Sequence, residues 1–114
     1  MFDFEKLTVY QKSIQFNLMV NTFLLNNKLD RNTHDQLKRA AFSIMLNIAE
    51  GAGRFTKPNK RNFYIISRGS AFECAAIFDY LRDLNKISED EFKQFYQDME
   101  EISKMLFVMI RKLQ

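Results

Sequence analysis

The sequence predicts an all-α fold, an antiparallel, up-down-up-down four-helix bundle that forms a single domain over residues 1–114. The first indication is that only 3 Gly and 1 Pro occur in 114 residues, too few for the turns of a many-stranded sheet. The second is that apolar residues recur at helical spacing over segments of about 20–28 residues. The third is that polar or glycine-containing breaks at 26–33, 51–58 and 85–88 separate these segments. Such short connections favour antiparallel neighbours.

The first segment predicts a helix over residues 6–27 that is apolar on two sides. One stripe consists of Leu7, Tyr10, Ile14, Leu18 and Leu25. The other consists of Val9, Phe16, Val20 and Phe23. A helix that is apolar on two sides is expected to be buried on two sides. In so small a bundle, this indicates a contact between subunits.

The second segment predicts a helix that begins at Thr33, because Thr33 and Gln36 fit a capping box. We expect it to end at Gly51 and Gly53, which can adopt the left-handed conformation of a helix stop. Its inward face is predicted to comprise Leu37, Ala40, Ala41, Ile44 and Ile48.

The third segment predicts a helix that starts near Pro58, which suits a first turn because it has no amide hydrogen. Its predicted face is Phe63, Ile66, Ser70, Cys74, Ile77, Leu81 and Leu84. Glycine inside a helix costs about 1 kcal/mol relative to alanine, so we expect Gly69 to mark a close approach to the second helix.

The fourth segment predicts a helix that begins with a capping box at Ser88 and Glu91, where acidic side chains complement the helix dipole. Its predicted inward face is Phe92, Phe95, Met99, Ile102, Leu106, Met109 and Leu113.

Polar side chains beside the apolar stripes allow two interpretations. Asn47 and Glu50 could be a binding or catalytic pair, and an enzyme would require them to share a pocket with Glu73. We favour a structural polar layer between the second and third helices, because buried polar groups are retained when they are partnered. The predicted layer is Ser43, Asn47, Glu50, Ser70 and Glu73. Glu50 and Arg54 also have the spacing of an ion pair on a helix surface.

The remaining chemistry predicts no catalytic residue, no metal site and no cofactor, so we expect no enzyme. His34 is the only histidine, and a lone histidine cannot supply the ligand pairs of a bundle metal site. Cys74 lies on an apolar stripe and is expected to be buried. The N-terminus has no apolar signal region, and the longest apolar run, 105–110, is too short for a membrane span. The expected location is the cytoplasm.

Basic charge is concentrated in the middle of the chain. Residues 31–70 carry eight basic and two acidic side chains, a net charge of +6 within a chain whose total is +3. This asymmetry indicates an anionic partner. The candidate nucleic-acid-binding residues are Lys38, Arg39, Arg54, Lys57, Lys60, Arg61 and Arg68. Phe55 and Tyr64 lie among them and could stack on bases. The alternative is that these charges are only solvated surface.

One bacterial family is similar to nearly the whole chain. The similarity rests on 38–44 (KRAAFSI), 47–51 (NIAEG), Arg54, Phe63, 68–70 (RGS) and Glu73, with the opening 4–13 and the region from Leu81 to Ile87 also fitting. The chain resembles the four-helix-bundle proteins encoded in intervening sequences of 23S ribosomal RNA genes. It departs from them at Ser67, where the family more often has alanine.

The resemblance implies a four-helix bundle that assembles as a ring-shaped homopentamer. It also implies kinship with the accessory protein of diversity-generating retroelements, which uses a basic surface to engage a reverse transcriptase and nucleic acid. Our first hypothesis is therefore a non-enzymatic, oligomeric protein that binds RNA or DNA phosphates through the basic patch. The alternative is a protein-interaction scaffold whose ring docks a partner protein without nucleic acid. We expect no interaction with membranes.

Overall fold

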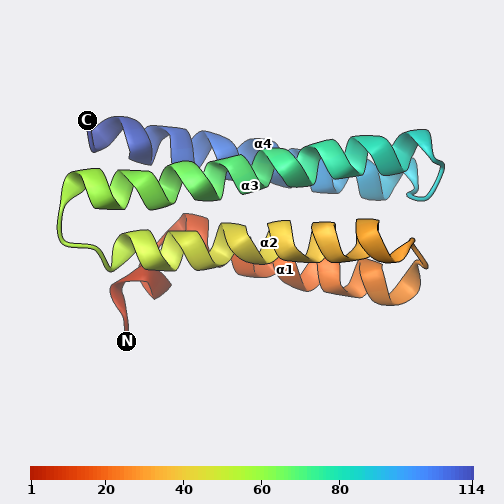
Figure 1. The fold of residues 1–114 in the computed structure, drawn as a ribbon, viewed down its shortest axis with the longest axis horizontal. Coiled ribbons are helices and arrows are strands. Elements are labelled where there is room, and N and C mark those ends of the chain that lie inside the picture. The colour runs from red at the N-terminus through yellow and green to blue at the C-terminus, as the bar shows by residue number, and fades with distance from the viewer.

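The computed structural model describes residues 1–114 and contains four long helices after a short 3₁₀ turn (Figure 1). The turn η1 spans Asp3–Lys6. The helices are α1 (Thr8–Asn26), α2 (Arg31–Ala52), α3 (Lys57–Asp83) and α4 (Glu89–Lys112). Successive helices run in opposite directions, which confirms the predicted up-down-up-down bundle (Figure 1).

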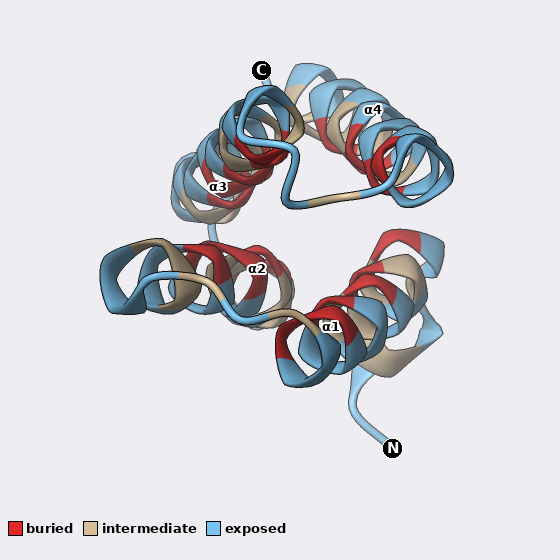
Figure 2. Cartoon of the chain, turned by 90° about the vertical axis from the view of Figure 1, so that its right-hand side faces the viewer, coloured by how far each residue is buried: buried red, intermediate tan, exposed pale blue.

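The four helices form two layers, α1 beside α2 and α3 beside α4, with the buried residues facing inward (Figure 2). Four phenylalanines meet in the core, and the rings of Phe78 and Phe95 stack with centroids 4.4 Å apart. Phe16 and Phe23 contact both of these rings edge-on. The contacts between α2 and α3 are the most extensive, and those between α1 and α4 are the least extensive of any neighbouring pair of long helices.

The start of α2 corrects the prediction. The helix begins at Arg31, and Asp30 is its N-cap: the Asp30 carboxylate accepts from the Thr33 amide at 3.1 Å. The Thr33 hydroxyl donates to the same carboxylate at 2.6 Å. Thr33 therefore lies inside the first turn. These bonds lower the pKa of Asp30, because they favour its charged form.

The end of α2 also differs from the prediction, because no glycine of the chain has a positive φ. Gly51 lies within the helix, and Gly53 caps it with φ −85° and ψ −5°. A Cβ at Gly51 would lie 2.7 Å from the ring of Tyr64. Gly51 is therefore required by a close approach of α3, and not by a left-handed turn.

The inward faces of α2 and α4 confirm the prediction. All five residues predicted for α2 are buried, as are the first five predicted for α4, while Met109 and Leu113 are half-buried. The predicted starts of α3 and α4 are also confirmed, with Thr56 and Ser88 as N-caps. In α1 the stripe of Val9, Phe16, Val20 and Phe23 is buried in the core, whereas Leu18 and Leu25 of the other predicted stripe are exposed.

The inward face predicted for α3 is wrong over the first turns of the helix. Of the two residues predicted to point inward there, Phe63 is half-buried and Ile66 is exposed. The buried positions are Tyr64 and Ser67. Leu84 is exposed as well. The close approach of α2 and α3 predicted at Gly69 is also wrong, since Gly69 is exposed and a Cβ there would meet nothing within 4 Å. The close approach of α2 and α3 occurs instead at Ser67, Ser70 and Gly51.

None of the helices combines the length and the apolar character that crossing a membrane requires.

Candidate nucleic-acid interface

Three helix ends meet at one end of the bundle: the C-terminus of α2, the N-terminus of α3 and the C-terminus of α4 (Figure 1). Two hydrogen bonds join them. Lys60 Nζ donates to the carbonyl of Ala52 at 2.9 Å, and Arg61 donates to the carbonyl of Leu113 at 3.0 Å. The fold therefore brings the last turn of α4 beside the first turns of α3.

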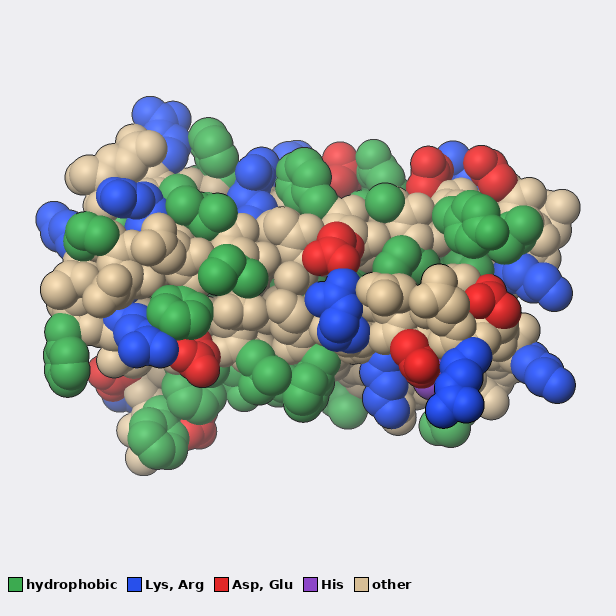
Figure 3. All heavy atoms as spheres, in the orientation of Figure 1, with side chains coloured by type: hydrophobic (Ala, Val, Ile, Leu, Met, Phe, Trp, Pro, Cys, Tyr) green, Lys and Arg blue, Asp and Glu red, His purple; other side chains and the backbone are tan.

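The lysines and arginines of these helix ends form what we call the basic end, which lies at the left of Figure 3. The basic end consists of Arg54, Lys57, Lys60, Arg61, Arg111 and Lys112. Arg111 and Lys112 were missed by sequence reasoning, because they are about fifty residues from the others in the chain. Their position in the last turn of the fourth helix could have predicted that they lie near the other cations, since that turn must lie beside the start of α3 in an antiparallel bundle.

Several of these cations already have structural partners. Arg54 pairs with Glu50 at 2.7 Å and lies over the ring of Phe63, 4.5 Å from its centroid. This confirms the ion pair predicted from spacing. Lys60 and Arg61 bond the carbonyls that α2 and α4 leave free at their C-termini. Lys57 has no ion pair or side-chain hydrogen bond, and it opens α3, where the helix dipole also favours anions.

The two aromatic candidates differ completely in exposure. Phe55, in the loop between α2 and α3, is 101% exposed. Tyr64 is 5% exposed, and its burial raises the pKa of its hydroxyl. Phe55 can therefore stack on a ligand, whereas Tyr64 supports the contact between α2 and α3.

Lys38, Arg39 and Arg68 do not belong to the basic end. Lys38 lies 14 residues before the end of α2, a distance of about 21 Å along the helix. Arg39 pairs with Glu73 of α3. Arg68 donates to the carbonyl of Ser103 at 3.3 Å, and its guanidinium lies over the rings of Phe72 and Phe107.

The predicted polar layer is only partly assembled. Ser70 Oγ donates to Ser43 Oγ at 2.8 Å, and the Asn47 amide donates to the same oxygen at 3.0 Å. Ser67, which was not predicted, donates to the carbonyl of Ile44 at 2.8 Å. Glu50 and Glu73 lie outside the layer, because both are exposed and paired with arginines. The structure does not bring Asn47, Glu50 and Glu73 into one pocket.

Cys74 is a buried thiol, and His34 is half-buried. Burial, and to a smaller extent the nearby charge of Glu73, raises the pKa of the Cys74 thiol to about 12, while Arg39 opposes the shift. The thiol is therefore protonated at neutral pH, and the thiolate is the reactive form. His34 lies beside Asp35 at 3.3 Å in the first turns of α2. No three His, Cys, Asp or Glu side chains are grouped so that they could hold a metal ion.

The fold and the basic end define a helical-bundle protein with a candidate anion-binding surface. The family described as 23S rRNA-intervening sequence protein matches residues 5–108, so this chain belongs to that family. The chain is also similar to a crystal structure from Bacteroides thetaiotaomicron, described as a protein of unknown function from the S23 ribosomal protein family. The TM-score is 0.84 at 26% identity, with 90% of this chain and 98% of that chain covered. No functionally curated protein matches the sequence.

Proposed function

We propose that this protein is a non-enzymatic, oligomeric nucleic-acid-binding protein of the cytoplasm that contacts RNA or DNA phosphates through its basic end. The observation that carries the proposal is that six lysines and arginines from three helix ends lie at one end of the bundle. Phosphate contacts require clustered cations and not a fixed motif. Membership of a family named for a ribosomal RNA intervening sequence is consistent with this partner.

Phe55 suggests how such a surface would select its ligand. Its ring stands fully in solvent between Arg54 and Lys57, and an exposed aromatic ring beside cations can stack on an unpaired base. We therefore expect single-stranded segments and loops to bind more tightly than a continuous duplex, whose bases are already stacked.

Binding is favoured over catalysis by two observations. The carboxylates that an active site would need, Glu50 and Glu73, are exposed and neutralised by arginines. The only thiol is buried, and its raised pKa keeps it protonated.

The alternative function, a protein-interaction scaffold, is favoured by exposed apolar residues on both layers. Leu18, Phe42 and Leu46 are exposed on the α1–α2 side, and Phe72, Tyr96 and Phe107 on the α3–α4 side. Exposed apolar patches commonly mark protein interfaces. A homo-oligomer would cover them, and it would repeat the basic end in each subunit.

The test is fluorescence anisotropy of a labelled single-stranded RNA across a salt series. Replacing Lys57 and Lys112 with glutamine should weaken binding at least tenfold. It should also flatten the dependence of log K on log salt concentration by about 0.7 for each phosphate that the variant no longer neutralises. The matched control, Lys28→Gln with Lys86→Gln, removes the same charge at the opposite end of the bundle.

Equal weakening by both double variants would show that net charge alone attracts RNA, and would overturn the assignment to the basic end. A Phe55→Ala variant should lose affinity for single strands while its affinity for duplex stays unchanged. Absence of RNA binding at low salt would leave the scaffold as the better explanation.

A further inference from the structure

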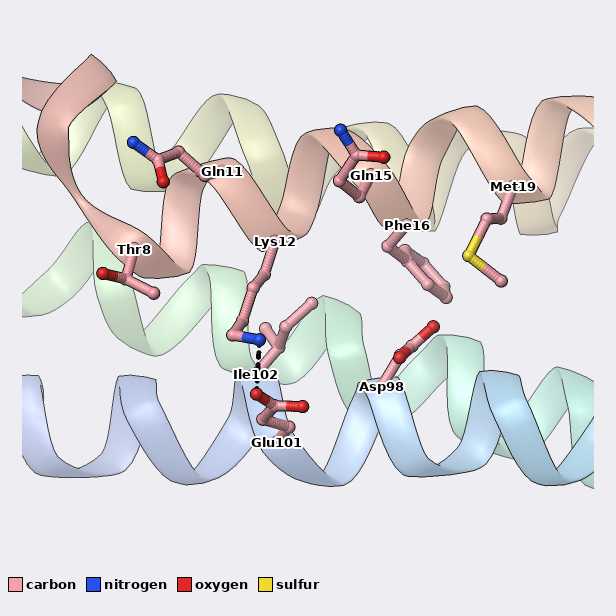
Figure 4. A pocket seen from close by; sticks show the side chains of 9 residues that line it. All are labelled: Thr8, Gln11, Lys12, Gln15, Phe16, Met19, Asp98, Glu101 and Ile102. Atoms are coloured by element: carbon pink, nitrogen blue, oxygen red, sulfur yellow. Dashed lines mark ion pairs between the residues drawn. The ribbon is translucent and has the colours of Figure 1, made fainter.

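The seam between α1 and α4 is the least closed part of the bundle, and a groove follows it. One hollow has a volume of about 430 Å³ and lies between Gln15 and Asp98 (Figure 4). A second, of about 490 Å³, lies nearer the α1–α2 loop, between Thr22 and Gln94. A third, of about 290 Å³, lies at the other end of the seam, between Val9 and Val108. Thr8 lines the first and third hollows, and Met19 lines the first and second, so the three hollows follow one another along the seam.

The floor of this groove is apolar. Phe16 and Ile102 form it in the middle, and Phe23 and Phe95 form it further along. All four side chains belong to the core, so the groove reaches directly to the hydrophobic interior. Met19 and Leu18 are exposed beside it. An apolar strip bordered by two helices is the shape that a third amphipathic helix fills.

The rim of the groove is strongly asymmetric in charge. The side formed by α4 carries four carboxylates, those of Asp90, Glu91, Asp98 and Glu101. The side formed by α1 carries one charge, Lys12, among neutral polar residues. Asp90 and Glu101 are eleven residues apart, so the acidic rim extends about 16 Å along the helix.

Lys12 shows how a basic side chain engages this rim. It reaches across the groove from α1 and pairs with Glu101 at 2.5 Å (Figure 4). Asp98, which lies nearly one turn away, forms no ion pair and points toward Phe16 and Met19 (Figure 4). Burial raises the pKa of Asp98, and the charge of Glu101 adds to the effect, while Gln94 and Lys12 oppose it. A second cation beside Asp98 would stabilise its charged form.

We propose that the α1–α4 groove binds an amphipathic helix of a partner protein whose apolar stripe is flanked by lysine or arginine. The stripe would lie on Phe16, Met19 and Phe95, and the flanking cations would pair with Asp98, Glu91 and Asp90. Complementary charge would fix the orientation of the helix and exclude acidic partners. This site lies on a different surface from the basic end, so it does not depend on the proposed nucleic-acid binding.

The test uses the full chain and a fluorescein-labelled model peptide with leucines at helical spacing and lysines beside them. Asp98→Asn with Glu101→Gln should weaken peptide binding at least tenfold. The control, Asp83→Asn with Glu100→Gln, also removes one aspartate and one glutamate, but neither residue lines the groove. It should change binding less than twofold. A peptide with glutamates in place of the lysines should not bind.

Three results would overturn the proposal: no saturable binding of the basic peptide up to millimolar concentration, equal losses in the two double variants, or equal binding of the acidic peptide. Sedimentation velocity supplies an independent check. If Asp98→Asn with Glu101→Gln dissociates the protein into smaller species, a second copy of the chain occupies the groove and the partner helix is refuted.

Discussion

Gly51 and Gly69 are both helical glycines, but their surroundings are opposite. Gly51 is buried against the ring of Tyr64, and an added Cβ would lie 2.7 Å from it. Gly69 faces solvent, and an added Cβ would touch nothing. A glycine is therefore structurally required at the first position, while nothing within the single chain requires it at the second.

We expect the two alanine substitutions to have opposite signs. Gly69→Ala should raise the free energy of unfolding by about 0.5–1 kcal/mol, because alanine loses less backbone entropy on forming a helix. Gly51→Ala should lower it by about 1 kcal/mol, because the strain of overpacking, about 1–3 kcal/mol, exceeds the gain in helix propensity. Urea denaturation followed by circular dichroism measures both. A stabilised Gly51→Ala would show that Tyr64 moves aside freely.

Among the helices, α2 and α3 make the most extensive contact, and hydroxyl groups lie where they meet. Ser70 Oγ donates to Ser43 Oγ, which also accepts from the amide of Asn47. Ser67 donates to a backbone carbonyl of the opposite helix. Small side chains let the helices approach closely, and each buried hydroxyl has a partner.

A double-mutant cycle measures this contact. Ser43→Ala and Ser70→Ala should each lower the free energy of unfolding by about 1 kcal/mol. Together they should cost about 0.5–1 kcal/mol less than their sum, because both remove the same bond. Ser103→Ala is the control: its hydroxyl bonds only within α4, so its effect should add to that of Ser70→Ala. Strict additivity of Ser43→Ala and Ser70→Ala would contradict a shared bond.

The existence of the four helices can be predicted from the hydrophobic periodicity and from the polar or glycine-containing breaks. Their exact ends and inward faces cannot, because several neighbouring residues are suited to the same position and the sequence pattern does not show which one takes it. Asp30 and Thr33 are both good N-cap residues, and the carboxylate is the one that caps. On α3 the larger apolar residues Phe63 and Ile66 suggested the inward face, yet the close contact with α2 selects Ser67. Likewise, Arg111 joins the basic end through the fold, at a distance in sequence that no local motif reveals.

At the scale of the whole molecule, each of the two helix layers carries its own exposed apolar patch. Phe42 lies on the α1–α2 side, and Phe72 lies on the α3–α4 side. If one patch of each subunit binds the other patch of the next, the contact is heterologous and can close into a ring.

This arrangement can be tested by mixing two defective variants. Phe42→Glu and Phe72→Glu should each prevent self-association, as measured by sedimentation velocity. Each variant retains one intact patch, so an equimolar mixture should form heterodimers and nothing larger. Unchanged oligomers in both single variants would place the contact elsewhere, and the five-subunit ring implied by the family resemblance would lose its structural basis.

The cluster of Phe16, Phe23, Phe78 and Phe95 has a consequence for the order in which the chain is made. Phe16 and Phe23 on α1 are synthesised well before Phe95 on α4, which both rings contact edge-on. On the ribosome, α1 can pair with α2, and Phe78 of α3 can cover one side of its rings, but the side that Phe95 contacts stays uncovered until α4 emerges. The nascent bundle therefore exposes an aromatic face for most of its synthesis, and such a face is open to chaperones or to a neighbouring nascent chain.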